Sequence, residues 1–383
     1  MKRDTYFGQS PRIARWKINN AFENWLSYKA DNWAFFKRLY VLFYKVFDHK
    51  YYVGGMPYIN EWLTRYQTKW VGQLNREDLV QDMIYCLHRY GISFQDYWIY
   101  EFPFKSNAAR ENFVSDKLRY HYCDILNDRT VLPLTTDKYA CYKRFKKFFK
   151  RDVLGIYSAV DFEGFEKFTQ THSKFIFKPL DEHSGRGIEL VHTKDIDVQL
   201  FFENKISKGP FVVEEVILQG EEVAKMHSAC VNSFRVVTFR LPNNEVKIIG
   251  VTWRIGSGNS VMDNAGAGGM FAVVNPELGF VETSARRYNT EEYLVHPDSG
   301  VIIPGFQLPK WNEAKEMIKN IALSLPEATM VSWDLCYSNK GWMMVEANDN
   351  GDWSIIQSNK KIGLKPLLYS LMDNHFEKLN QHN

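Results

Sequence analysis

The sequence lacks any continuous apolar run that approaches the ~20 residues of a membrane-spanning helix. Its first residues, "MKRDTYFGQSPRIARWK", also lack the apolar core of a secretory signal peptide. Cysteine is scarce, and the five cysteines, at positions 86, 123, 141, 230 and 336, follow no CxxC spacing. Such scattered cysteines are typical of reduced thiols and not of a disulfide framework or a zinc site. We therefore expect a cytoplasmic protein.

A strong charge of either sign is also missing. The chain carries 48 lysines and arginines against 45 aspartates and glutamates, a net charge of +3. No global field attracts nucleic acid, and we expect no such partner. What the sequence does have is size and apolar content: 383 residues, 45% apolar and 15% aromatic. It can therefore fold into two or three domains with a substantial core.

Residues 1–125 are predicted to form a mainly helical, aromatic-rich region. The segments 32–47 and 75–91 contain no proline, and the second repeats apolar residues at helical spacing before Gly91. The first is apolar on more than one face, with Lys37, Arg38 and Lys45 interspersed. Two interpretations are open: peripheral contact with a membrane surface, or packing inside a helical domain. The pattern favours packing.

The pattern changes after about residue 170. Short runs rich in Val, Ile, Phe and Trp, among them "KFIFKPL", "FVVEEVIL", "SFRVVTFRL" and "EVKIIGVTWRIG", are bounded by Gly, Pro or Asn and predict strands. Turn residues at 243–244 and 338–341 predict hairpins. Strands joined by hairpins with occasional helices, such as 312–325, indicate an α+β fold with largely antiparallel sheets.

The last predicted hairpin carries a candidate metal site. Glu346 and Asn348, in "MMVEANDNGDW", project to the same side of their strand, and Asp334 comes from the strand before the turn. Carboxylate and amide oxygens are hard donors that suit Mg²⁺. A hydrated polar turn explains the same residues, and the local pattern alone does not decide between the two.

Two further segments are suited to a nucleotide. Lys178 ends a predicted strand and precedes the turn Ser184–Gly185–Arg186–Gly187, where glycines allow backbone N–H groups to approach phosphate oxygens. No GxxxxGK[ST] motif occurs, and a lone glycine turn is more often an ordinary hairpin. In "FVVEEVI", the adjacent Glu214 and Glu215 must face opposite sides of a strand whose backbone can meet adenine. Glu222, seven residues beyond Glu215, is a candidate for contact with the ribose hydroxyls of the same nucleotide.

Taken in order, these segments resemble the ATP-grasp superfamily. The matching features are "DKYACYKRF" with Lys138, "FIFKP" with Lys178, "SGRG", "VVEEVI" and the final "D…EAN" set. Within the superfamily the chain most resembles the sugar-transfer-associated ATP-grasp family of bacterial polysaccharide gene clusters. "GISFQDYWIYEF", "VNSFRVVTF", "DNAGAGGMFAVV", "HPDSG" and "WDLCYSNKGWMMVEAND" carry that resemblance, which covers residues 90–360.

The resemblance implies two α+β subdomains that grip ATP between antiparallel sheets, at residues 126–215 and 216–383, after the helical region. It implies that ATP is bound by Lys138, Lys178, Ser184, Gly185, Arg186, Gly187, Glu214, Glu215, Val216 and Glu222. It also implies that Asp334, Glu346 and Asn348 bind two Mg²⁺ ions.

The activity implied is an ATP-dependent ligase that joins a carboxylate to an amine through an acylphosphate. The substrates implied by the family's setting are an amino acid and an amino sugar or glycan precursor. Many superfamily ligases carry an arginine two residues before the metal aspartate, whereas this chain has Ser332. Arg235 is our first candidate for the missing cation and Arg254 the second, and Asn232 is a candidate for positioning substrate.

Two alternatives stay open. One is an ATP-grasp phosphotransferase that passes the γ-phosphate to a hydroxyl acceptor. The other is a nucleotide-binding scaffold in glycan assembly that has no catalytic activity. We assign no role to the isolated histidines His183, His227 and His296.

Overall fold

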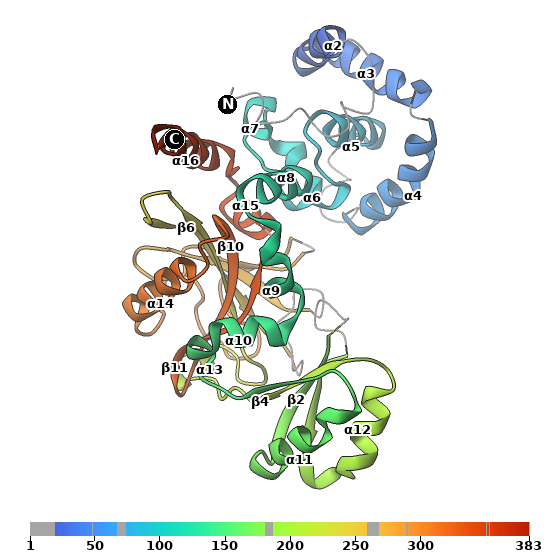
Figure 1. Cartoon of the computed structure of the whole chain (residues 1–383). Helices are drawn as coiled ribbons and strands as arrows, with labels where there is room; N and C mark the ends of the chain where they lie inside the picture. Colours follow the sequence, from blue (N-terminus) through green and yellow to red (C-terminus); the bar gives the residue numbers. More distant parts are fainter. Residues whose placement is uncertain are drawn as a thin grey trace. The chain divides into compact units, whose positions relative to one another are not determined.

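The chain forms two compact units in the computed structural model, which describes residues 20–47, 49–66, 74–180, 187–258, 268–288, 290–349, 351 and 353–382 (Figure 1). The first, here called the helical unit, comprises Met1–Ile125, Tyr288–Glu291 and Asp352–Asn383. The second, here called the sheet unit, comprises Leu126–Arg287 and Glu292–Gly351.

Helices make up the regular structure of the helical unit. They are α2 (Asn20–Asn32), α3 (Ala34–Phe47), α4 (His49–Tyr66), α5 (Arg76–Arg89), α6 (Phe94–Ile99), α7 (Asn107–Arg110), α8 (Asp116–Leu126), α15 (Ser354–Lys360) and α16 (Lys365–His382). Helix α5 shows how local sequence sets these bounds: the Asn75 side chain accepts hydrogen bonds from two backbone N–H groups of the first turn, and Gly91 follows the helix at φ +70°.

A partly buried carboxylate connects several of these helices. Asp82 of α5 accepts two hydrogen bonds from Arg110 of α7, at 2.9 and 2.7 Å, one from Lys37 of α3 at 2.8 Å and one from the Tyr97 hydroxyl of α6 at 2.7 Å. Burial alone would raise the pKa of Asp82, but Arg110 and Lys37 outweigh it and the pKa is lowered. The charge network therefore sets how α3, α5, α6 and α7 pack.

The C-terminal helices also belong to this unit. The Gln357 side chain of α15 accepts from the backbone N–H of Val114 at 2.8 Å and donates to its carbonyl at 2.9 Å. The sequence pattern instead predicts that Asp352–Asn383 belong with the strands of residues 216–383, whereas the structure places them in the helical unit. This pairing joins residues 243 positions apart, which no local pattern indicates.

The sheet unit contains two antiparallel sheets. The smaller has the strand order β1 (Val153–Ile156), β4 (Phe211–Glu215), β2 (Lys174–Pro179) and β3 (Glu189–His192). Helices α11 (Phe162–Thr171) and α12 (Val198–Ile206) pack on it through a phenylalanine-rich core, in which Phe165 and Phe202 contact Phe211.

The larger sheet has seven strands. Their order is β11 (Gly341–Asn348), β10 (Met330–Ser338), β5 (Phe234–Arg240), β6 (Val246–Ile255), β7 (Met270–Val274), β8 (Ala285–Arg286) and β9 (Glu292–Tyr293). The remaining helices of the unit are α9 (Leu132–Thr136), α10 (Lys138–Phe149), α13 (Glu221–Ala224) and α14 (Trp311–Leu323).

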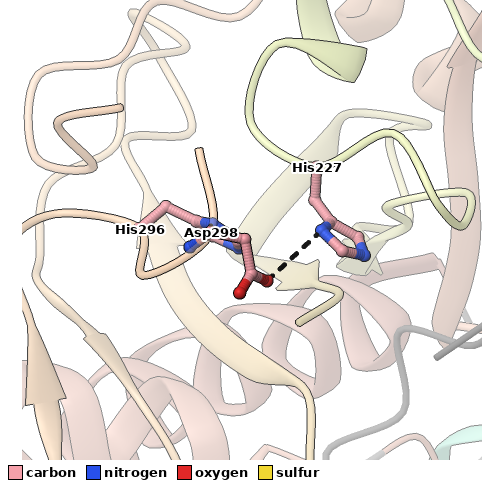
Figure 2. A group of neighbouring side chains, drawn as sticks. All are labelled: His227, His296 and Asp298. Atoms are coloured by element: carbon pink, nitrogen blue, oxygen red, sulfur yellow. Dashed lines mark hydrogen bonds and ion pairs between the residues drawn. The ribbon is translucent and has the colours of Figure 1, made fainter. Parts of the chain in front are cut away.

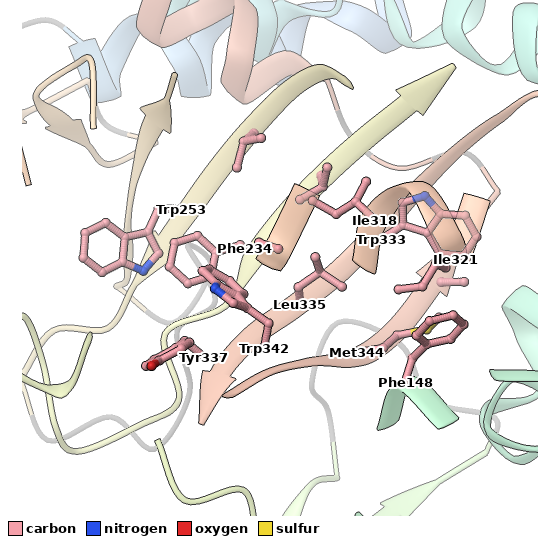
Figure 3. Close-up of a cluster of buried hydrophobic side chains, with 14 of the residues drawn as sticks. Phe148, Phe234, Trp253, Ile318, Ile321, Trp333, Leu335, Tyr337, Trp342 and Met344 are labelled. Carbon is pink, nitrogen blue, oxygen red and sulfur yellow. The ribbon is translucent and has the colours of Figure 1, made fainter. Parts of the chain in front are cut away.

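One face of the larger sheet is the main hydrophobic core of the unit. Figure 3 shows Trp253, Trp333 and Leu335 from neighbouring strands with Ile318 and Ile321 of α14, and all five side chains are fully buried. Successive residues of a strand face opposite sides of the sheet. The residues between these apolar ones, Arg254 and Asp334 among them, therefore face the other side.

The structure confirms the predicted α+β class with antiparallel sheets and a helical N-terminal region. Each predicted strand quoted above is a strand of the structure, and hairpins form at 243–244 and 338–341. Of the predicted helix 32–47, residues 34–47 form α3, while Asn32 ends α2 and Trp33 lies between the two helices. Within the described parts of the chain, no helix has the length and apolarity that crossing a bilayer requires.

We predict that Gly363→Ala destabilises the helical unit. A Cβ at Gly363 would lie 1.9 Å from the carbonyl oxygen of Asn112, and backbone cannot move aside as a flexible side chain does. The free energy of unfolding should fall by about 1–3 kcal/mol or more, measured by thermal denaturation. Gly54→Ala is the control, since nothing lies within 4 Å of its Cβ position. Equal stability of both variants would contradict the prediction.

Candidate active site

Four charged side chains form a row across four adjacent strands of the larger sheet. Glu346 of β11 pairs with Asp334 of β10, and Asp334 pairs with Arg235 of β5. Arg254 of β6 lies two residues beyond Thr252, which pairs with Arg235. Directly opposed residues on antiparallel strands project to the same face, so these four, here called the charged row, share one face.

Asp334 is held by both arginines of the charged row. Arg235 donates from Nε to Oδ1 at 2.9 Å and from Nη2 to Oδ2 at 3.0 Å, and Arg254 Nη2 donates to Oδ2 at 2.6 Å. The carboxylate is buried, which alone would raise its pKa, but the two guanidinium groups hold the pKa of Asp334 well below its usual range. Asp334 is therefore a fixed negative charge that orients two cations.

Glu346 differs from Asp334 in lacking such partners. Its carboxylate makes no hydrogen bond or ion pair with any residue that the structure describes, and burial and the nearby charge of Asp334 raise its pKa. On the same side of β11, the amide nitrogen of Asn348 is buried and likewise has no hydrogen-bond partner among the described residues. Rotating this amide exchanges its nitrogen for its oxygen, so Asn348 can offer a donor oxygen.

These residues fit a divalent cation. Glu346 has two unshared oxygens, and Asn348 has a polar atom that needs a partner. A cation would also relieve the repulsion between Glu346 and Asp334, which lie opposite each other. Hard oxygen donors of this kind select Mg²⁺ over softer metals. Both oxygens of Asp334 already accept hydrogen bonds from the arginines, so only their remaining lone pairs could bind a metal. Glu346 and Asn348 are therefore the better-placed metal ligands.

The two lysines predicted to meet the nucleotide lie near this row. Lys178 Nζ is 2.8 Å from Glu214 Oε1 in a buried ion pair. Lys138 Nζ donates to the carbonyl of Pro179 at 3.3 Å. Burial lowers the pKa of Lys138, and the neighbouring charge of Lys178 adds to this, while Glu346 acts in the opposite direction. The structure thus brings both lysines toward the carboxylate end of the charged row.

Glu214 has a role in the fold that its sequence context did not reveal. Besides Lys178, it accepts hydrogen bonds from Arg151 Nε at 3.2 Å and Nη2 at 2.8 Å. Burial opposes ionisation, but Lys178 and Arg151 lower the pKa of Glu214 to about 2. Its carboxylate is therefore charged and already paired, and contact with adenine stays a prediction.

Arg151 joins the two sheets of the unit. Its Nη1 donates to the carbonyl of Met344 at 2.6 Å and its Nη2 to that of Val345 at 3.3 Å. The ladder of β10 and β11 shifts register at this point, since Glu346 pairs with Asp334 whereas Met344 pairs with Leu335. Val345 is the extra residue of a bulge, and Arg151 satisfies the carbonyl groups beside it. The smaller sheet is thereby fixed to the strand that carries Glu346.

The other predicted nucleotide contacts are placed as follows. Ser184, Gly185 and Arg186 lie outside the described residues, whereas Gly187 has φ +70° and a Cβ there would lie 2.9 Å from Pro179. Glu215 faces the opposite side from Glu214 and pairs with Lys340 Nζ at 2.8 Å. Val216 follows β4 directly, and Glu222 is exposed on α13. Their contacts with a nucleotide stay predictions.

Asn232 is buried and fully engaged inside the protein. Its Nδ2 donates to Gln219 Oε1 at 3.0 Å and to the carbonyl of His227 at 2.7 Å, and its Oδ1 accepts from the N–H of Gly256 at 2.9 Å. These bonds fix the start of β5 against the end of β6, the strands that carry Arg235 and Arg254. Direct contact with substrate stays a prediction for this residue.

The structure gives a reason for the serine at position 332. A Cβ on Gly351 would lie 2.1 Å from Ser332 Oγ, so this backbone passes directly over the serine side chain. The Arg235 side chain lies beside the same point, with its Cδ 3.6 Å away. A long side chain at 332 does not fit, and Arg235 brings its guanidinium to this region from the neighbouring strand.

A histidine-rich cluster lies near the end of β6. Figure 2 shows Asp298 directed at His227, with Oδ2 3.7 Å from Nδ1, and His296 beside them. His296 uses both ring nitrogens, because Nε2 lies 2.9 Å from the carbonyl of Gly256 and Nδ1 accepts from the backbone of Asp298 and Ser299. His296 therefore stabilises its own turn, and its nitrogens are not available to a metal without losing these bonds.

A second group of possible metal ligands comprises Asp152, His172 and Glu215, of which the last two already contact other residues. Lys340 Nζ already places a positive charge 2.8 Å from Glu215 Oε1. The His172 ring stacks on Phe168 and its Nδ1 lies 2.9 Å from that residue's carbonyl. Among the groups that the described chain brings together, the charged row is thus the better candidate for metal-dependent chemistry.

Comparison with known proteins identifies the family. The family model described as "Sugar-transfer associated ATP-grasp" matches residues 117–372, about two thirds of the chain. The chain belongs to the sugar-transfer-associated ATP-grasp family. The family resemblance and the ATP-grasp fold inferred from the sequence are thereby confirmed. No curated protein matches this ATP-grasp chain significantly.

Solved ATP-grasp structures resemble the chain at low sequence identity. The ATP-grasp ligase PsnB, solved with a minimal precursor, is 12% identical with a TM-score of 0.40, and the match covers 68% of this chain and 67% of PsnB. The D-alanine–D-alanine ligase of Bacillus anthracis is 13% identical with a TM-score of 0.39, over 67% and 72%. The biotin carboxylase domain of Hydrogenobacter thermophilus 2-oxoglutarate carboxylase, in complex with MgADP, is 14% identical with a TM-score of 0.37, over 60% and 43%.

Arg151 is the residue of this ATP-grasp site that the sequence did not reveal. It ends a run of alternating basic and aromatic residues, "YKRFKKFFKR", in which nothing distinguishes it from five other cations. Its one distinguishing feature is its place between α10, which ends at Phe149, and β1, which begins at Val153.

We predict that Arg151→Met lowers the stability of the sheet unit because Glu214 would lose one of two buried counter-charges. The free energy of unfolding should fall by about 2–4 kcal/mol near neutral pH, measured by urea denaturation. In the wild type, stability from Glu214 is present above its ordinary pKa of 4.5 and is lost as the pH falls toward 2. The difference between variant and wild type should therefore shrink with acid.

Arg144→Met is the matched control for this variant. Arg144 forms a half-exposed pair with Glu327 at 3.5 Å, so its loss should change stability by less than about 1 kcal/mol at any pH. The prediction would be contradicted if Arg151→Met lost no more unfolding free energy than this control, or if its loss relative to the wild type grew as the pH falls.

Proposed function

We propose that this protein is an ATP-dependent carboxylate–amine ligase that acts through an acylphosphate. The observation that carries the proposal is the charged row with Lys138 and Lys178 beside it. The proposed metal ligands Glu346 and Asn348 adjoin four cations, which are the two arginines of the charged row and the two lysines. Phosphoryl transfer needs this combination, because negative charge must be neutralised on the oxygens of the transferring group.

The reaction has two steps. A carboxylate oxygen of the first substrate attacks the γ-phosphorus of ATP, the bond between that phosphorus and the β–γ bridging oxygen breaks, and ADP leaves. The amine nitrogen of the second substrate then attacks the acyl carbon, inorganic phosphate leaves and the nitrogen loses a proton. Glu346 and Asn348 would hold Mg²⁺, which would neutralise negative charge on the phosphate oxygens.

Many superfamily ligases have an arginine two residues before the metal aspartate, where this chain has Ser332. We assign the role of that arginine to Arg235 and Arg254. Both are oriented by the buried Asp334, and both are partly exposed, at 17% and 19% of the side chain. Arg235 is the first candidate for the acylphosphate because it donates to both oxygens of Asp334 and is fixed more rigidly. A positioned guanidinium needs little reorganisation when charge develops on the substrate.

The nucleotide roles follow the sequence predictions. Lys138 and Lys178 contact the phosphates and base, the Ser184–Gly187 turn covers the β- and γ-phosphates, and Glu222 meets the ribose. The backbone after Glu214, at Glu215 and Val216, meets adenine. Because Lys178 and Arg151 already neutralise the Glu214 carboxylate, we assign adenine contact mainly to this backbone.

For the substrates, we propose an amino acid and an amino sugar or another precursor of a polysaccharide. The support is the family's association with sugar transfer. Product analysis with panels of carboxylates and amines tests the reaction type. ADP and phosphate that appear only when both substrates are present support the ligase. A phosphorylated acceptor would instead show a phosphotransferase, and tight ATP binding without turnover would favour a scaffold.

We predict that Glu346→Gln lowers Mg²⁺-dependent turnover by about 10²-fold or more, because the amide carries no charge to hold the cation. Calorimetry should also show that Mg²⁺ no longer tightens ATP binding in this variant. Glu203→Gln, at an exposed position on α12, is the control and should match the wild type. Normal turnover by Glu346→Gln would refute the assignment of the metal site.

We predict that Arg235→Lys lowers kcat by about 10²-fold while the KM for ATP changes little, since the forked guanidinium would act mainly on the transition state. Steady-state kinetics with the identified substrates measures both constants. Arg240→Lys, on the same strand but hydrogen-bonded to the carbonyl of Pro326 and to Asn244, is the matched control. If Arg235→Lys raised only the KM for ATP, Arg235 would be a ground-state binding residue.

A further inference from the structure

Helix α3 exposes a continuous apolar stripe. Phe35, Leu39, Leu42 and Val46 are 66%, 38%, 53% and 63% exposed. Their spacing of four, three and four residues places them within an arc of about 60° on one side of the helix, over a length of about 16 Å. An exposed apolar stripe of this length is unusual for a surface helix and indicates an interaction site.

The opposite side of α3 already packs inside the helical unit. Tyr40, Val41 and Tyr44 are buried in its core, and Lys37 bonds to Asp82. The helix therefore has two apolar sides, and the folding of its own unit uses only one of them. The sequence of residues 32–47 allows two interpretations, packing and membrane contact, because a helix with two apolar sides can use one for each.

Positive charge borders the exposed stripe. Arg38 and Lys45 are seven residues apart and lie along the same edge of it, about 70–90° from its centre. Arg38 has one carboxylate nearby, Asp78 at 3.6 Å, and both side chains are more than 60% exposed, so solvent screens this pair. Lys45 lies over the ring of Tyr52. Helix α3 itself contains no acidic residue.

The neighbouring helices also expose aromatic and apolar side chains. Tyr28 and Trp33, at the end of α2 and just before α3, are 63% and 50% exposed, and α4 exposes Val53 and Tyr58 at 52% and 61%. Between positions 33 and 60 the sequence has four lysines and arginines against a single carboxylate, Asp48. Tyrosine and tryptophan favour the boundary between lipid and water.

We propose that the face formed by Phe35, Arg38, Leu39, Leu42, Lys45 and Val46, here called the α3 face, docks on membranes that contain anionic lipid. The apolar stripe enters the headgroup region while Arg38 and Lys45 extend toward lipid phosphates. Charge favours a membrane over a second copy of the chain, because anionic headgroups attract Arg38 and Lys45. An antiparallel symmetric dimer through this face would instead place each basic edge against its counterpart, and like charges would oppose it.

Sedimentation of the full chain with vesicles tests the proposal. The wild type should bind vesicles of phosphatidylcholine and phosphatidylglycerol and bind pure phosphatidylcholine vesicles much more weakly, with binding that falls as salt rises. Leu42→Asp should reduce binding to the anionic vesicles about tenfold or more. Since Leu42 is already half exposed, the variant should keep the wild-type thermal stability.

Two further variants make the test specific. Leu200→Asp, at a 65% exposed leucine on α12, is the matched control and should bind vesicles like the wild type. The double variant Arg38→Gln/Lys45→Gln should lose the preference for anionic vesicles but keep the apolar stripe. Equal binding by wild type and Leu42→Asp, or no binding by either, overturns the proposal, as does a wild-type dimer that Leu42→Asp dissolves without any vesicle binding.

Discussion

The architecture of the candidate site depends on the burial of one charged carboxylate, Asp334. Taking a carboxylate out of water is expensive, by several kcal/mol, unless partners compensate for the lost hydration. Here the partners come from the two next strands, where Arg235 and Arg254 satisfy both oxygens. A slip of one residue between β10 and β5 would turn Asp334 into the apolar face that contains Trp333 and Leu335. The ion pairs and the hydrophobic core therefore specify the same register.

The buried charge of Asp334 also determines the electrostatic environment of Glu346. Both arginines are hydrogen-bonded to Asp334, and Glu346 on the outer strand lies opposite this fixed negative charge without a hydrogen bond or ion pair to a described residue. Burial and the charge of Asp334 outweigh the opposing effect of Lys178, Arg235 and Arg254, so the pKa of Glu346 is raised. That arrangement favours either protonation of Glu346 or the binding of a cation. Mg²⁺ bound at the proposed ligands Glu346 and Asn348 would relieve the repulsion between Glu346 and Asp334 and would thereby stabilise the sheet.

The sequence predicted those parts of the site that depend on local order. Glu346 and Asn348 share a strand, and a four-residue turn brings Asp334 opposite them, so alternation and hairpin geometry are sufficient. The pairing of Arg235 with Asp334 depends on which distant strands become neighbours, and these residues are 99 positions apart. Arg151 and the docking of α15 in the helical unit escaped prediction for the same reason, since each rests on contacts between segments far apart in the chain.

A crystal structure of the chain with Mg²⁺ and a non-hydrolysable ATP analogue would show whether the charged row is the active site. We expect metal density about 2.1 Å from oxygens of Glu346 and Asn348, with the γ-phosphate facing Arg235 or Arg254. Metal bound instead at the cluster of His227, His296 and Asp298, or a nucleotide remote from the charged row, would contradict it.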